Sequence, residues 1–320
     1  MIVVSKRKKM IKKLLTGALA GLLSMGAFAW QPTKPVTVII AYGPGSGNEI
    51  LIRKLDSIIT RTNKINFVLE FKPGAFELIG MNHFAKAAND GHVLYAPGVG
   101  VYYGTPVWFK KSLVQDPSEW EPVISLGETP LAVFTSADNA VNHPRELFNL
   151  MKSGQKINIG VGAPVFVLAH EHMVKTTGAK QAQRVQYNSP AAVAQAAASK
   201  EVEFGLAPLG VVTELANAGR LKIIGVTGSA PGRHHSLSDQ FKGLDLVGHV
   251  GLMLPKGTAK PVVDYYKKVF AAAIATSEYQ SFLAGINFYD SLKTPEAYKV
   301  FIDGQRRRWI PVAETIEFQQ

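Results

Sequence analysis

The chain has 320 residues, a formal net charge of +11 at pH 7, 47% hydrophobic residues and no cysteine. The lack of cysteine excludes a disulfide framework, thiolate metal ligands, a cysteine nucleophile and a lipid-modified cysteine. Residues 1–29 contribute six Lys and Arg without an acidic residue, so the remainder of the chain carries only +5. This mild, dispersed charge argues against a nucleic-acid partner and leaves room for small anionic ligands.

Residues 1–29 have the pattern of a signal peptide. The basic stretch 6–13 precedes the short apolar run 14–25, and Ala27-Phe28-Ala29 is a small-residue cleavage site. An uncleaved membrane anchor is the alternative, but the apolar run is too short to span a bilayer comfortably. We therefore expect cleavage before Trp30 and a periplasmic protein.

The first strand and helix of the remaining chain enclose a glycine-rich loop. Segment 36–41 is rich in β-branched residues, which predicts a buried strand, and a helix follows with Asn48 as its expected N-cap. The loop 42–48 between them lets a ligand approach backbone N–H groups at the helix start, where Glu49 also suits the positive dipole end. The pattern predicts an anion site, and a plain chain reversal is the alternative. Neither phosphate motif is present, because Asn48 stands where Walker A requires Lys and the dinucleotide motif requires Gly.

An alternation of strands and helices continues from this loop. Strands are predicted at 65–71 and 93–96, with a helix at 78–88 between them. The order β-α-β-α-β predicts an α/β fold with a parallel sheet, in which ligands lie beyond the C-terminal ends of the strands. The loops expected at that edge are 42–48, 72–77 and 97–100.

The middle of the chain predicts a second domain. The long extended segment 121–136, interrupted by Gly127 and Pro130, is expected to cross between two sheets and to serve as a hinge. Strands are then expected at 157–161, 184–187, 202–206, 221–226 and 250–254, and helices at 144–151, 164–175, 189–199, 213–218, 261–275 and 294–309. The predicted domain 1 is discontinuous, with residues 30–128 and 252–320, and domain 2 spans residues 129–251.

No enzyme motif is complete. His170 and His172 are two residues apart, which points them to different helix faces, whereas a zinc hydrolase needs two His one helical turn apart. The pair His234 and His235 lacks a third metal ligand nearby, and Ser46 lacks the flanking glycines of a nucleophile elbow. We predict no catalytic residue, no cofactor and no metal site.

Six segments resemble, in the same order, the extracytoplasmic solute receptors of tripartite tricarboxylate transporters, the Bug family. They read YGPGSGNE at 42–49, EFKPGA at 70–75, ANDGHVL at 88–94, VQYNSPA at 185–191, AGRLKIIGVT at 218–227 and LPKGTA at 254–259. The resemblance implies a type II-like periplasmic-binding-protein clamshell, in which each of two domains is a βα-layered sheet flanked by helices. It also implies a small organic acid in the cleft, hinge closure around it, and delivery to the membrane subunits of a transporter.

The resemblance implies which loops line the cleft, and it also shows where this chain departs from the family. The first loop, which presents N–H groups to a carboxylate, is conservatively altered, whereas Phe76 and Glu77 replace two glycines of the second loop. Apolar residues replace a Gly/Ser/Thr-rich loop at 162–166, and Ala207 replaces an Asp. The predicted ligand-binding residues are Tyr42, Ser46, Gly47, Asn48, Glu49, Ala75, Phe76, Glu77, Ala163, Pro164, Val165, Phe166, Tyr187 and Ala207.

These departures lead us to expect a carboxylate at the first loop and an apolar remainder of the cleft. Such a cleft favours an aromatic or longer-chain, amphipathic acid over a compact polyacid. Glu49 and Glu77, if they face inward, would repel a second carboxylate and favour a ligand with an amine or hydroxyl donor. Ordinary packing is the alternative role of the apolar residues. A monomeric receptor is expected; the alternatives are an exported ligand sensor for signalling and an exported enzyme on the same scaffold.

Overall fold

The computed structural model describes residues 30–228, 234–292 and 294–316. The predicted signal peptide, residues 1–29, lies outside the described residues. Pro32–Gln320 forms one compact unit. Within the described part of the chain, no helix combines the length and the apolar character that a membrane crossing needs.

The first three strands form the parallel sheet that their alternation with helices predicts. Strand β1 (Val36–Ile40) lies between β2 (Phe67–Phe71) and β3 (Val93–Ala96), in parallel register with both. Helix α2 (Gly47–Asn63) follows β1 and buries one apolar face, because its apolar residues recur at helical spacing. Helix α3 (Leu78–Phe84) follows β2.

A second parallel set follows along the chain. Strand β5 (Ile157–Val161) pairs in parallel with β6 (Ala182–Gln186) and with β7 (Phe204–Pro208). The connecting helices are α6 (Pro164–Thr177) and α7 (Pro190–Ala198). Each begins with proline at its first position, where the missing N–H costs no helical hydrogen bond.

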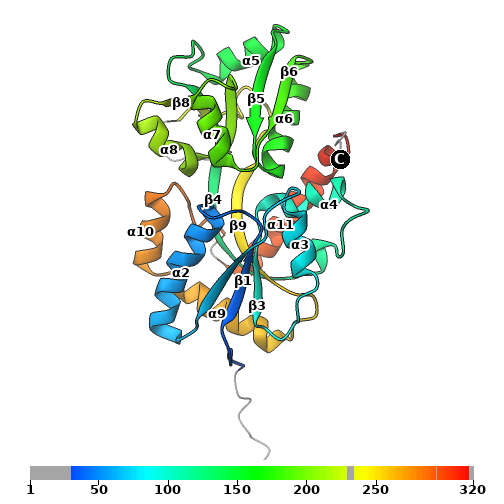
Figure 1. The fold of residues 1–320 in the computed structure, drawn as a ribbon, viewed down its shortest axis with the longest axis vertical. Coiled ribbons are helices and arrows are strands. Elements are labelled where there is room, and N and C mark those ends of the chain that lie inside the picture. Colours follow the sequence, from blue (N-terminus) through cyan, green and yellow to red (C-terminus); the bar gives the residue numbers. More distant parts are fainter. Residues whose placement is uncertain (1–29, 229–233, 293, 317–320) are drawn as a thin grey trace, which may run out of the picture. The chain divides into compact units, whose positions relative to one another are not determined.

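Strand β4 (Glu121–Ser136) belongs to both sheets. From Glu121 to Pro130 it pairs antiparallel with β9 (Val247–Leu254), and from Leu131 onward it pairs with β7 and β8 (Leu221–Val226). The strands therefore form the continuous path β2-β1-β3-β9-β4-β7-β5-β6, with β8 beside β4. Figure 1 shows β4 and β9 running between the two groups of elements. The predicted crossing strand is thus present, and the exact domain boundaries stay a prediction.

The remaining helices cover these sheets. They are α4 (Thr105–Trp108), α5 (Pro144–Lys152), α8 (Leu209–Asn217), α9 (Lys260–Ile274), α10 (Ser277–Gly285) and α11 (Pro295–Ala313), with short 3-10 turns at Val99–Tyr102 and Pro117–Glu119. Helices α9 and α11 both contact β4, so the C-terminal segment packs back on the first sheet (Figure 1). The sequence did not predict α10, and α8 begins four residues earlier than expected because it starts directly after Pro208.

Tyr298 of α11 occupies a tightly enclosed position against β9. Its hydroxyl lies 2.6 Å from the hydroxyl of Tyr102, and its ring stacks on His249 with centroids 5.0 Å apart. A Cβ added at Gly251 would lie only 2.1 Å from the Tyr298 Oη. This close approach requires glycine at position 251.

We therefore expect Gly251→Ala to lower the free energy of unfolding by roughly 1–3 kcal/mol, because overpacking forces Tyr298 or β9 to move. Gly304→Ala is the matched control, since Gly304 lies inside α11 with no atom within 4 Å of an added Cβ. This control should gain up to about 1 kcal/mol from helix propensity. Urea unfolding of both variants measures the difference, and equal effects would contradict this account of the Tyr298 contact.

Candidate functional site

A cavity of about 400 Å³ lies where loops from both sheets meet. This volume is within the range of small-molecule sites. Its lining residues are Tyr42, Gly43, Pro44, Gly45, Ser46, Gly47, Asn48, Pro73, Gly98, Val99, Thr129, Ala163, Val165, Phe166, Asn188, Ser189, Pro190, Ala191, Pro208, Val211, Gly248, His249, Val250 and Phe288. None of these described residues is Asp, Glu, Lys or Arg, so the part of the lining that the structure describes carries no acidic or basic side chain apart from one histidine.

Four helices begin at the wall of this cavity. The lining includes Gly47 at the start of α2 and the residues that precede α6, α7 and α8, namely Ala163, Ser189 and Pro208. A helix start carries a partial positive charge and N–H groups without intrahelical partners. The described part of the wall therefore offers positive potential and hydrogen-bond donors from backbone groups, which suits a small anion.

The start of α2 differs by two residues from the sequence-based prediction. Ser46, not Asn48, is the N-cap: its backbone is extended, and its Oγ accepts a hydrogen bond from the Glu49 N–H at 3.4 Å. Asn48 lies in the first turn of the helix, and its Nδ2 donates to the Ala96 carbonyl at 2.7 Å. Asn48 thus ties the glycine-rich loop to the end of β3.

Glu49 does not line the cavity. Its carboxylate accepts hydrogen bonds from the Gly45 N–H and from the Arg53 Nε, both at 2.7 Å. Burial acts to raise the pKa of Glu49, but these two hydrogen bonds outweigh it and the pKa is lowered. Glu49 therefore closes the loop on itself and has its charge compensated, and the inward-facing position from which it would repel a second ligand carboxylate is not observed.

Glu77 lies directly behind the cavity wall. It is 2% exposed, and it accepts a hydrogen bond from the Tyr42 hydroxyl at Oε1 and from the Gly98 N–H at Oε2, the latter at 3.0 Å. Burial raises the pKa of Glu77 to about 7, although both hydrogen bonds oppose the shift. Tyr42 and Gly98 line the cavity whereas Glu77 does not, so Glu77 is connected to the cavity by its hydrogen bonds with these two residues.

The segment that carries Glu77 is strained. Ala75, Phe76 and Glu77 have φ values of 46°, 52° and 74°, and each left-handed residue other than glycine costs roughly 1–2 kcal/mol. The Phe76 ring packs edge-on against Trp108 with centroids 6.1 Å apart, and the Phe76 carbonyl accepts a hydrogen bond from the Thr105 Oγ1. Ala75 and Phe76 are therefore held outside the cavity lining.

Of the ligand-binding residues predicted in the second sheet, some line the cavity and others do not. Ala163, Val165 and Phe166 line the cavity. Pro164 lies against Gly100, where an added Cβ would be 2.6 Å from its ring. The Tyr187 hydroxyl donates to Glu201 at 2.8 Å, outside the lining, and Ala207 is in the hydrophobic core.

Of the predicted ligand-binding residues, the structure brings together Tyr42, Ser46, Gly47, Asn48, Ala163, Val165 and Phe166 in the cavity lining. It places Glu49, Ala75, Phe76, Glu77, Pro164, Tyr187 and Ala207 outside that lining. Whether the first group binds a ligand stays a prediction.

Several lining residues escaped the sequence analysis. The start of α7 contributes Asn188, Ser189 and Ala191. The segment 185–191 resembles the family, so it carried a usable signal. Phe288 follows helix α10, which the sequence analysis did not predict, and no sequence motif marked it as a lining residue.

His249 on β9 is another lining residue that sequence reasoning missed. It is 3% exposed, and its Nε2 lies 3.1 Å from the Ser125 Oγ. Burial lowers the pKa of His249 to about 3, so the ring is neutral at physiological pH. The cavity wall therefore carries no histidine charge.

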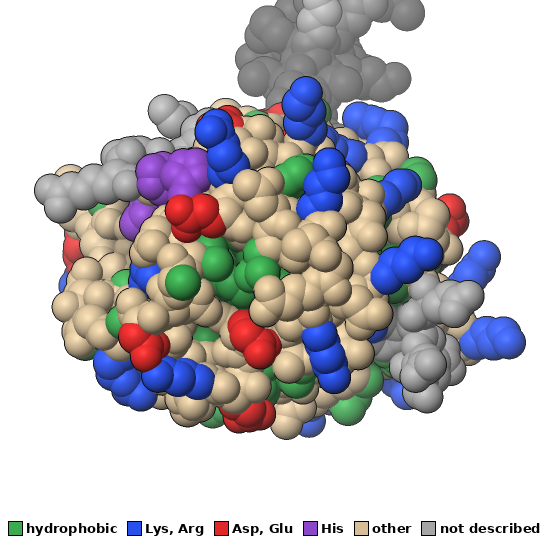
Figure 2. Space-filling view, turned by 90° about the horizontal axis from the view of Figure 1, so that it is seen from above, with side chains coloured by type: hydrophobic (Ala, Val, Ile, Leu, Met, Phe, Trp, Pro, Cys, Tyr) green, Lys and Arg blue, Asp and Glu red, His purple; other side chains and the backbone are tan. Residues whose placement is uncertain are grey.

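The histidines singled out in the sequence lie away from this cavity. His170 is buried with its Nδ1 3.2 Å from Glu171, whereas the His172 Nε2 lies 2.9 Å from the Lys242 carbonyl, so the two point in different directions as predicted. His143 and His235 are in ring contact, with centroids 4.3 Å apart. Figure 2 shows histidine side chains gathered at one edge of the face seen from above. Among the described residues no group of three or more His, Cys, Asp and Glu side chains is arranged to hold a metal ion.

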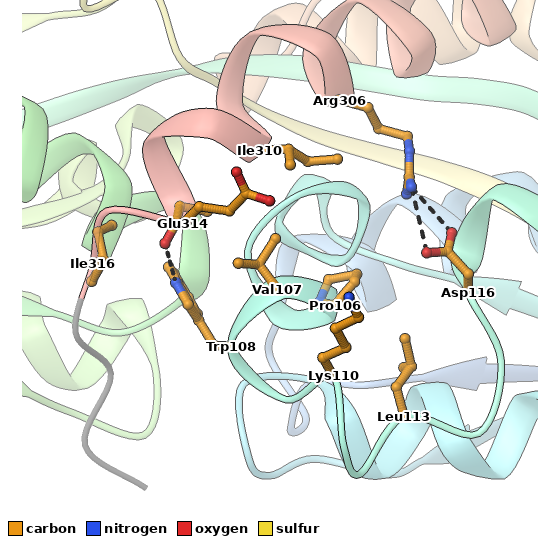
Figure 3. A pocket seen from close by; sticks show the side chains of 11 residues that line it. Pro106, Val107, Trp108, Lys110, Leu113, Asp116, Arg306, Ile310, Glu314 and Ile316 are labelled. Atoms are coloured by element: carbon orange, nitrogen blue, oxygen red, sulfur yellow. Dashed lines mark hydrogen bonds and ion pairs between the residues drawn. The ribbon is translucent and has the colours of Figure 1, made fainter.

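A second cavity, of about 470 Å³, lies between α4 and α11 (Figure 3). Arg306 forms an ion pair with Asp116 at 3.1 Å on one side, and the Trp108 Nε1 donates to the Ala313 carbonyl on the other. Its lining places the carboxylates of Asp116 and Glu314 beside Lys110 and Arg306, and none of the longer helices of the described chain begins there. The first cavity is thus the better candidate for an anion.

The raised pKa of Glu77 makes protein stability depend on pH. Between pH 4.5 and about 7 the folded protein retains a proton that the unfolded chain releases, so stability falls with rising pH by about 3 kcal/mol in total. Glu77→Gln removes this dependence, so its stability relative to the wild type should rise across that window and level off above it.

Urea unfolding between about pH 5 and pH 8 measures this difference. Glu201→Gln is the control, because Glu201 accepts from a tyrosine hydroxyl as Glu77 does but is exposed. A constant stability difference between Glu77→Gln and the wild type over this range would contradict the assignment.

Comparison with known proteins extends these observations. The family model described as "Tripartite tricarboxylate transporter family receptor" (TctC) matches residues 51–318. BugT of Bordetella pertussis is 21% identical over 313 residues, covering 92% of this chain and 93% of that protein.

Two solved structures show the same fold. MatC of Rhodopseudomonas palustris with bound malate has a TM-score of 0.80 at 18% identity and covers 89% of this chain and 100% of that one. R. palustris Rpa4515 with adipate has a TM-score of 0.82 at 19% identity, covering 89% and 98%. The fold is thus the mixed α/β two-domain periplasmic-binding-protein fold, and the chain belongs to the TctC family of tripartite tricarboxylate transporter receptors, the Bug family that its sequence motifs resemble.

Proposed function

We propose that this protein is a periplasmic receptor that captures a small organic acid in the cavity between its two sheets. The observation that carries the proposal is the set of four helix starts around a cavity whose described lining residues include no Asp, Glu, Lys or Arg. One carboxylate would be held by N–H groups at the start of α2, where Gly47 leaves the backbone accessible. The malate and adipate bound by two structurally similar proteins support an organic acid as the ligand class.

The apolar part of the lining narrows the acid further. Val165, Phe166, Val211 and Phe288 contribute apolar surface, and the described lining residues include no Lys or Arg that could neutralise a second or third carboxylate. An aromatic or longer-chain acid would bury its hydrocarbon part there at about 25 cal/mol per Å². A compact polyacid would lose hydration at its additional carboxylates without gaining an ion pair.

Capture would proceed by closure about the crossing strands. Residues from both sheets line the cavity, so a ligand that contacts both favours the closed arrangement over the open one. The closed form would then deliver the solute to membrane subunits of a tripartite tricarboxylate-type transporter. The signal-peptide pattern of residues 1–29 supports export to the periplasm.

A panel of carboxylates tests the ligand class. We expect benzoate and hexanoate to raise the melting temperature of the protein from Trp30 onward more than malate or citrate does, because a ligand that binds only the folded state stabilises it by mass action. A larger shift with citrate than with either monocarboxylate would contradict the apolar assignment. Stabilisation by an acid that the protein does not convert would favour a receptor over an exported enzyme. Capture of a partner other than a transporter subunit would favour a signalling sensor.

A charge placed at a helix start tests the site itself. We expect Ser189→Asp to weaken binding of the acid roughly tenfold or more, because a carboxylate in the cavity wall repels the bound anion at short range. The protein should remain folded, since Asp is as good an N-cap as Ser.

Thr294→Asp is the matched control for this variant. Thr294 caps α11 with an Oγ1 that accepts from a backbone N–H at 3.2 Å, as the Ser189 Oγ does for α7, but it is exposed and outside the cavity lining. Isothermal titration of both variants with the acid that gives the larger thermal shift measures the effect. Equal affinities would place the acid elsewhere.

A further inference from the structure

Tyr42 connects the cavity to a buried carboxyl group. Tyr42 lines the cavity, and its hydroxyl donates to the Oε1 of Glu77, which is 2% exposed. The hydroxyl also lies close to the backbone of Gly98, where an added Cβ would be only 2.4 Å from the Tyr42 Oη. The contact between Tyr42 and Glu77 is therefore built into the packing of the cavity wall.

The hydrogen atoms at this contact can be counted in both charge states of Glu77. When Glu77 is ionised, its two oxygens accept from Tyr42 and from the Gly98 N–H. The only hydroxyl hydrogen of Tyr42 is then used, so Tyr42 presents a lone pair, and no donor, to the cavity. A ligand carboxylate, which only accepts hydrogen bonds, is poorly served by this state.

Protonation of Glu77 reverses the direction of the bond. The Gly98 N–H still needs an acceptor, so Oε2 remains unprotonated and the carboxyl hydrogen resides on Oε1. Oε1 then donates to the Tyr42 Oη, and the hydrogen of Tyr42 becomes available to the cavity. Tyr42 is thereby converted from an acceptor into a donor without any movement of heavy atoms.

The surroundings of Glu77 permit this protonation near neutral pH. The titratable groups around it are the buried tyrosines Tyr42, Tyr95, Tyr102 and Tyr103, and among the described residues no cation contributes to its electrostatics. Burial, and then the Glu77 charge, raise the pKa values of Tyr95 and Tyr103, so both stay neutral. Glu77 is the group of this cluster that changes charge in the physiological range.

We propose that the receptor takes up one proton with its carboxylate solute, that Glu77 accepts this proton from solvent, and that Tyr42 consequently donates a hydrogen bond to the solute. This inference rests on the proposed function. Glu77 is a positioning residue for the Tyr42 hydrogen and does not touch the solute. The coupling favours capture in mildly acidic surroundings, and a solute that offers a neutral donor, such as an amide, should show the opposite pH dependence.

The linkage fixes the sign and the size of the effect. Below about pH 7 Glu77 is already protonated and the affinity for a carboxylate should be constant. Above that pH each binding event takes up a proton, so affinity should fall by up to tenfold per pH unit. The ligand carboxylate is itself ionised throughout, so it contributes no slope.

Isothermal titration with hexanoate and benzoate between about pH 5.5 and pH 8.5 tests the proposal, in two buffers with different heats of ionisation. We expect uptake of close to one proton per ligand at the highest pH and close to none at the lowest. Glu77→Gln mimics the protonated state, because its amide N–H can donate to Tyr42 while its carbonyl accepts from Gly98. This variant should bind with the low-pH affinity of the wild type at every pH.

Two further variants distinguish coupling from a structural effect. Tyr42→Phe removes the donor and should bind more weakly with a flat pH profile. Glu201→Gln alters the tyrosine–glutamate pair of Tyr187 and Glu201, which lies outside the cavity lining, and should keep the wild-type profile. A Glu77→Gln variant that retained the wild-type pH dependence would overturn the proposal.

The remaining outcomes separate this proposal from the proposed function. If an acid binds the wild type with an affinity independent of pH, the proton coupling fails and the receptor function stands. If neither acid binds at any pH, the proton coupling and the assignment of an aromatic or longer-chain acid are overturned, and the receptor function is overturned as well only if malate and citrate also fail to bind. Infrared spectra of the ligand-free protein give an independent result: the C=O stretch of a buried protonated carboxyl near neutral pH, absent in Glu77→Gln, is expected, and its absence in the wild type would overturn the coupling.

Discussion

The continuity of β4 through both sheets determines where every cavity-lining loop lies. Its pairing changes from β9 to β7 and β8 at Pro130 and Leu131, so the two sheets share one strand that runs antiparallel to its neighbours. The loops at the C-terminal ends of β1, β3, β5 and β7 therefore meet at one cavity, although they are far apart in sequence. A ligand that bound there would contact both sheets, so the crossing strand determines the geometry of the candidate binding site.

This geometry would allow an anion to bind to backbone groups. Four helix starts supply positive potential, and the described lining residues include no Lys or Arg that could adapt to several ligand geometries. The two glutamates of the neighbouring loops would spoil the site if they faced inward, but Glu49 is neutralised by Arg53 and Gly45, and Glu77 is buried behind Tyr42. A cavity without fixed charges can accept a single carboxylate and an apolar body together.

The sequence was sufficient to predict the alternation of strands and helices, because hydrophobic periodicity and turn residues depend directly on local structure. It predicted β3, β4, β5 and β8 with the observed bounds. The sequence could not predict which of the candidate site residues line the cavity, because their side-chain directions depend on tertiary contacts. Phe76 turns toward Trp108, Tyr187 toward Glu201, and Asn48 toward Ala96, and each partner is distant along the chain.

The Tyr42–Glu77 contact requires a strained backbone at 75–77, which lowers the stability of the folded protein. Three consecutive left-handed residues and a buried carboxyl both lower stability, and a glycine-rich turn with an apolar residue would avoid both penalties. The packing of Phe76 on Trp108 and the hydrogen bond from Thr105 hold the segment in place, so the cost is distributed over the first sheet and its neighbouring helices. Strained residues beside a cavity are typical of functional positions, and here the strain places a titratable group one hydrogen bond away from Tyr42 in the cavity lining.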